Sequence, residues 1–63
     1  MQNKNAKQLV KDVCTQLESA KGTLDQAIQS AEKQENKQSI TNTLSAVDSA
    51  LSTANGTLST YKD

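Results

Sequence analysis

Apolar residues recur along this 63-residue chain at alternating intervals of three and four positions, in two separate runs. The first run is Ala6, Val10, Val13, Leu17, Ala20, Leu24, Ala27 and Ala31, and the second is Ile40, Leu44, Val47, Leu51, Ala54, Leu58 and Tyr61. An average spacing of about 3.5 residues is typical of helices that pack against each other as in coiled coils. The pattern therefore predicts an all-α fold in one domain, residues 1–63, with helices over about residues 5–33 and 37–60.

The polar segment EKQENKQS, residues 32–39, predicts a turn between the two helices. One continuous helix would place the two runs on opposite sides, because nine positions at about 100° each amount to a half turn. A turn at about residues 34–36 instead lets the runs face each other in an antiparallel hairpin. Asn36 is the expected N-cap of the second helix, and Asn5 followed by Gln8 is a similar start signal for the first.

A repeated octapeptide supports this pairing. LESAKGTL, residues 17–24, and LSTANGTL, residues 51–58, share five residues at the same spacing and lie 34 positions apart. A hairpin in which paired residue numbers add to 71 sets Leu17 opposite Ala54 and relates the two copies by a local pseudo-two-fold axis. Small residues then face large ones at most levels, as close antiparallel packing requires.

Two features leave alternatives open. Gly22 and Gly56 occupy equivalent outward positions, where each is either a tolerated surface glycine or a point at which another backbone approaches closely. The same apolar runs would also suit a dimer of long helices with the turn opened, although the pairing favours the closed hairpin.

The second helix needs support from packing, because twelve of the 23 residues from Ser39 to Tyr61 are Ser, Thr or Asn. At about 0.5 kcal/mol each relative to Ala, they oppose helix formation by about 6 kcal/mol. A stripe of small residues beside each apolar run offers a second packing surface, so a homodimeric four-helix bundle is favoured over an ordinary solvated surface. The candidate interface comprises Ala20, Thr23, Ala27, Ser30, Thr43, Ala46, Ala50, Thr53 and Thr57.

Charge and composition exclude several partners. Seven Lys and no Arg balance seven acidic residues, so the chain lacks the basic surface that binds nucleic acid or an anionic membrane. No apolar run exceeds two residues, as at Leu9-Val10, which argues against a membrane span or a signal peptide. The expected location is the cytoplasm.

Few residues here could carry chemistry, since the chain has no His. Cys14 lies at the border of the predicted core, where it is either a small hydrophobic residue or a redox thiol with Lys11 and Lys21 nearby. The acidic residues of the first helix are spaced for a solvated face rather than for a shared acid–base site. No catalytic residue, metal ligand or cofactor is predicted.

The chain resembles a family of short proteins from spore-forming bacteria, catalogued as domain of unknown function 1657. The resemblance rests on Val10-Lys11, the block LESAKGTLDQA from Leu17, the Gln- and Asn-rich segment from Glu32, and Tyr61-Lys62. The chain lacks the Pro and the acidic cluster expected before the terminal Tyr. The resemblance implies a small cytoplasmic helical protein, associated with sporulation, and transfers no site residues.

These patterns together predict a non-enzymatic protein with a structural or protein-interaction role. The alternative is a thiol-based redox or regulatory protein that uses Cys14.

Overall fold

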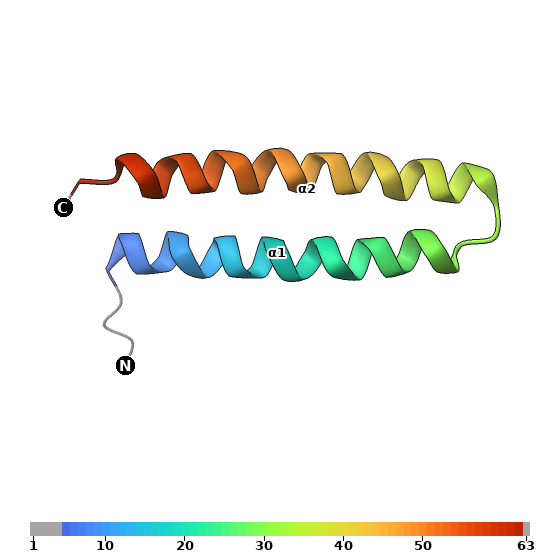
Figure 1. The fold of residues 1–63 in the computed structure, drawn as a ribbon, viewed down its shortest axis with the longest axis horizontal. Helices are drawn as coiled ribbons and strands as arrows, with labels where there is room; N and C mark the ends of the chain where they lie inside the picture. Colours follow the sequence, from blue (N-terminus) through green and yellow to red (C-terminus); the bar gives the residue numbers. More distant parts are fainter. Residues whose placement is uncertain (1–4, 63) are drawn as a thin grey trace.

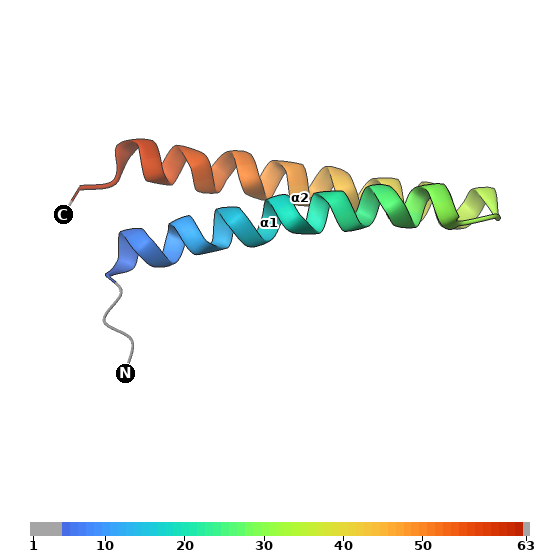
Figure 2. The ribbon, with the colours of Figure 1, turned by 60° about the horizontal axis from the view of Figure 1, so that its bottom comes forward.

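The computed structural model describes residues 5–62, which form two antiparallel α-helices joined by a short turn (Figure 1). Helix α1 spans Ala6–Ser30, 25 residues, and α2 spans Gln34–Thr60, 27 residues. The turn lies at one end of the molecule, and the helices cross at a shallow angle (Figure 2). The predicted all-α antiparallel hairpin is confirmed, closed within one chain.

Helix α1 begins with the predicted cap. The Gln8 backbone N–H donates to Asn5 Oδ1 at 2.9 Å, and the Asn5 backbone N–H donates to Gln8 Oε1 at 3.1 Å. This reciprocal pair is a capping box, which satisfies two backbone donors that a helix start would otherwise leave unpaired.

The turn occupies residues 31–33, three positions earlier than the expected residues 34–36. The N-cap of α2 is Lys33, whose side chain makes no capping hydrogen bond, and Asn36 lies inside the first turn of the helix. The prediction that Asn36 caps α2 is therefore wrong.

Backbone hydrogen bonding explains the earlier start of α2. The Lys37 N–H donates to the Lys33 carbonyl oxygen at 3.1 Å, so the added residues gain helical hydrogen bonds. Glu35 stands in the first turn, where a carboxylate interacts favourably with the helix dipole. Gln and Glu are also good helix formers, and together these contributions outweigh the roughly 1 kcal/mol that an Asn cap provides.

The contact between the helices is shown by the side chains that are not fully exposed. Seven of these on α1 and the turn are Val10, Cys14, Leu17, Lys21, Leu24, Ile28 and Ala31, and seven on α2 are Lys37, Ile40, Leu44, Val47, Leu51, Ala54 and Leu58. We call these fourteen positions the seam; Asp12, Ala20, Ala27 and Tyr61 are partly buried beside it. The two series mirror each other about a residue-number sum of 68, and this register sets Leu17 opposite Leu51 and Leu24 opposite Leu44.

This register corrects the expected sum of 71. The ion pair between Lys21 Nζ and Asp48 Oδ1, 2.9 Å long, joins residues whose numbers add to 69 and so supports the observed alignment. Helix α2 presents the predicted apolar run, whereas α1 is rotated by one residue. Cys14 replaces Val13, which is left 45% exposed, and Lys21 and Ile28 join the partly buried Ala20 and Ala27 at the contact.

The octapeptide repeat acquires a structural meaning in this register. Leu17 and Leu51 are equivalent members of the repeat and also lie opposite each other across the seam. A local pseudo-two-fold axis therefore passes between them, rather than between the expected pairs Leu17–Ala54 and Ala20–Leu51. Gly22 and Gly56 point into open space, because a Cβ added at either position meets nothing within 4 Å. Within the hairpin both are surface glycines.

The hairpin forms a single layer with little interior. Of residues 5–62, Cys14 and Leu51 alone are buried, at 8% and 7% exposed, and no described side chain is below 2%. The shortest dimension of the molecule is 11 Å, about the diameter of one helix. Chains of this length seldom obtain enough stability from so small a core without additional support.

Candidate interaction surface

The small-residue stripes of the two helices lie on one side of the hairpin. Residues one position before each seam residue point to the same side on both helices, because the helices run in opposite directions. We call this surface the uncharged face. It comprises Leu9, Val13, Gln16, Ala20, Thr23, Ala27 and Ser30 of α1 with Asn36, Ser39, Thr43, Ala46, Ala50, Thr53 and Thr57 of α2.

All nine residues of the predicted interface belong to the uncharged face. Ala20 and Ala27 are partly buried at the edge of the seam, and the other seven are exposed. The sequence did not anticipate that Val13 would belong to this surface, since the apolar run placed it in the core. The structure thus brings the predicted residues together, while their role as an interface stays a prediction.

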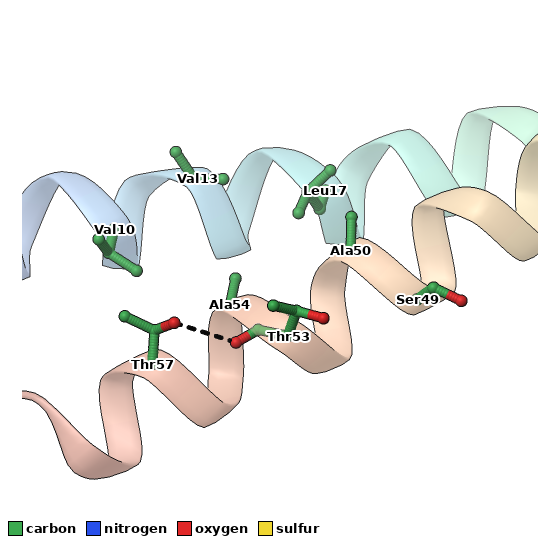
Figure 3. Close-up of a pocket in the computed structure, with 8 residues that line it drawn as sticks. All are labelled: Val10, Val13, Leu17, Ser49, Ala50, Thr53, Ala54 and Thr57. Carbon is green, nitrogen blue, oxygen red and sulfur yellow. Dashed lines mark hydrogen bonds between the residues drawn. The ribbon is translucent and has the colours of Figure 1, made fainter.

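An open groove of about 560 Å³ lies on this side, between the N-terminal half of α1 and the C-terminal half of α2 (Figure 3). Its α1 wall consists of the bulky residues Val10, Val13 and Leu17. Its α2 wall consists of small residues: Ser49, Ala50, Thr53, Ala54 and Thr57. The groove therefore has one large-residue wall and one small-residue wall at the same level of the hairpin.

Three of the four threonine hydroxyls on the uncharged face are satisfied within their own helix. Each of the three donates to the carbonyl oxygen four residues earlier, and Figure 3 draws the bond from Thr57 to Thr53 at 3.2 Å. The other two are Thr23 to Ser19 at 3.2 Å and Thr43 to Ser39 at 3.1 Å, whereas the Thr53 hydroxyl makes no such bond. Covering Thr23, Thr43 and Thr57 would therefore leave their hydroxyl hydrogens paired.

Charges gather on the opposite side, which we call the polar face: the residues one position after each seam residue. It carries Lys11, Glu18, Asp25, Glu32 and Asp48 among the described residues. Lys21, a seam residue, extends its ammonium group to this side and pairs with Asp48. The hydrogen bond to Asp48, and then the Asp48 charge, raise the pKa of Lys21 above its ordinary value of 10.5.

Cys14 is a free thiol at a seam position, and the register places it opposite Ala54. At 8% exposed it occupies the role of a small hydrophobic residue, which was one of its two predicted roles. The alternative, a redox thiol, stays a prediction.

Among residues 5–62, no group of three or more His, Cys, Asp or Glu side chains is arranged to hold a metal ion. Neither helix is long and apolar enough to cross a membrane.

Comparisons with protein-family models, with curated proteins and with solved structures found no match. The resemblance to the family of unknown function therefore stays a prediction, and the physical features of the hairpin carry the functional argument.

Proposed function

We propose that this protein is a non-enzymatic structural or protein-interaction module that works as a homodimer. In the proposed assembly two hairpins pack their uncharged faces together in an antiparallel four-helix bundle. The observation that carries the proposal is the imbalance between a seam with only two buried residues and a continuous uncharged surface beside it. A second layer of helices would convert that surface into a core, which is how helical bundles of this size obtain stability.

The segregation of charge supports a protein partner. A surface without charged residues offers no attraction to nucleic acid or to anionic lipid headgroups. Packing between helices needs only complementary shape and side chains that can be desolvated, and small residues allow helix axes to approach closely. We place this module in the cytoplasm, and the family resemblance adds a role in sporulation, testable by its abundance in sporulating and growing cells.

Sedimentation equilibrium over a concentration series, with and without reductant, tests the proposal. The expected result is a dimer of about 13.6 kDa, twice the 6.8 kDa chain, whose stability does not depend on reductant. A monomer at every concentration would overturn the proposal. A dimer that disappears on reduction would shift the interpretation to the alternative function, a thiol-based regulator using Cys14.

A further inference from the structure

We infer that the uncharged face binds a second copy of this chain about a two-fold axis parallel to the length of the hairpin. In this arrangement both turns lie at the same end of the dimer, and α1 of each copy covers α2 of the other. The inference rests on the proposed function and specifies its surface and geometry.

The two walls of the groove provide the first argument. Val10, Val13 and Leu17 form a ridge of large side chains, and the facing wall of α2 contains only Ser, Ala and Thr. Within one chain the walls leave about 560 Å³ open between them. A two-fold axis along the groove lays the large wall of each copy on the small wall of the other, at the same level. Large side chains set against small ones are the condition for dense helix packing.

Two exposed side chains identify where this contact would be strongest. Leu9 is 52% exposed and Val13 is 45% exposed, and both project from the α1 side of the uncharged face. In the two-fold arrangement Val13 lies over the second copy's Thr53 and Thr57. The Thr57 hydroxyl already donates within its helix, so Val13 can cover it without leaving that donor unpaired.

Charge also favours a second copy over other partners. The uncharged face places no like charges against each other when it meets itself, so self-association meets no electrostatic opposition. A charged peptide would find no countercharge there. The charged residues of the polar face would lie on the outside of both copies, in contact with water.

The available area is sufficient for a stable dimer. A face about 38 Å long, from 25 residues at about 1.5 Å each, and about 20 Å wide covers roughly 750 Å² per copy. The dimer would bury roughly 1,500 Å² in total, which is within the range of specific protein–protein interfaces.

Charge-adding substitutions on the uncharged face, matched by the same substitutions on the polar face, test whether the uncharged face is the dimer interface. Val13→Lys and Ala50→Glu add a charge to the uncharged face, and Thr15→Lys and Ser52→Glu add the same charges at exposed positions of the polar face. We expect the first pair to raise the dimer dissociation constant at least tenfold and the second pair to change it less than threefold. Circular dichroism of each variant checks that helix content is retained.

The outcomes separate the inference from the proposed function. A wild-type monomer would overturn both. A wild-type dimer that tolerates Val13→Lys and Ala50→Glu, or that responds instead to the polar-face variants, would overturn the uncharged face as the interface, both in the inference and in the proposed assembly, and would leave the homodimer itself standing.

Spin labels in the turn test the symmetry. Glu32→Cys in a Cys14→Ala background places one label per chain at an exposed turn position. Adjacent helices lie about 10 Å apart, so turns at the same end predict a label separation of roughly 20–30 Å by pulsed electron resonance. Turns at opposite ends predict roughly 40 Å or more, the length of α2. The longer distance would overturn the parallel two-fold axis.

Discussion

Leu51→Ala is the sharpest test of the seam, because Leu51 is the less exposed of the two buried side chains, at 7% against 8% for Cys14. The substitution removes three buried carbon groups, and at about 0.8 kcal/mol each it should lower the free energy of unfolding by about 2.5 kcal/mol. Buried Leu-to-Ala changes range from about 2 to 5 kcal/mol, and the larger values arise where an enclosed cavity remains. In a single layer of helices the vacated space adjoins solvent, so a value near the lower end is expected.

That loss is large for a chain of this size. A stability of about 0.05–0.15 kcal/mol per residue corresponds to roughly 3–9 kcal/mol for 63 residues, so about a quarter or more would disappear. The melting temperature should fall by about 10–20 °C. Far-ultraviolet circular dichroism during thermal and urea unfolding measures both quantities at one protein concentration.

Ser52→Ala is the matched control, since Ser52 is the exposed neighbour of Leu51 on the same helix. It should leave stability unchanged or raise it by up to about 0.5 kcal/mol through helix propensity. If Leu51→Ala cost less than about 0.5 kcal/mol, or no more than the control, Leu51 would not anchor the contact between the helices. The register with residue numbers adding to 68 would then be refuted.

Three further substitutions test other parts of the hairpin. Asn5→Ala removes the capping box and should cost about 1 kcal/mol, with faster amide exchange confined to the first turn of α1; uniform exchange along α1 would contradict this. Gly22→Ala should raise the free energy of unfolding in urea by up to about 1 kcal/mol, because the added methyl group meets open space. If the substitution instead weakened the dimer, another backbone would have to approach Gly22 closely. Lys21→Gln tests pH dependence. Because the pKa of Lys21 is raised in the folded state, its pairing with Asp48 stabilises fully below about pH 10.5 and is lost as the pH rises through the folded-state pKa. As the pH rises into the alkaline range, the free energy of unfolding of the wild type should therefore fall by an amount that Lys21→Gln does not show. An equal pH dependence in the two proteins would exclude a contribution of the Lys21–Asp48 pair to stability.

The position of the ion pair shows how a charged residue can occupy the seam. Lys21 lies between Leu17 and Leu24 in the contact series, and its aliphatic stem can pack there while the ammonium group reaches Asp48 on the polar face. The side chains of Lys21 and Asp48 are 40% and 53% exposed. Pairs this exposed contribute little to stability, so apolar packing remains the main source of the register.

Local chemistry along the chain was enough to predict the helical hairpin. The three–four spacing of apolar residues determined two helices, and on α2 the run from Ile40 to Leu58 is the face that contacts α1. Asn5 and Gln8 were identifiable as a cap because a capping box depends on residues only three positions apart. The nine small residues of the candidate interface share one face because their spacing matches that of the seam.

The tertiary structure alone decided how α1 is rotated. Two overlapping series are possible on α1, and they share Val10, Leu17 and Leu24. One adds alanines and Val13, whereas the other adds Cys14, Lys21 and Ile28. The number of apolar residues favours the first series, but only contact with α2 shows that the second sets Leu opposite Leu and partly buries Ile28. The turn lies earlier in the chain than expected because α2 gains helical hydrogen bonds by starting before Asn36. Whether those bonds outweigh an Asn cap depends on how the two helices meet. Rotation by one residue is also what exposes Val13 and opens the groove, so the candidate site follows from packing between the helices rather than from local sequence.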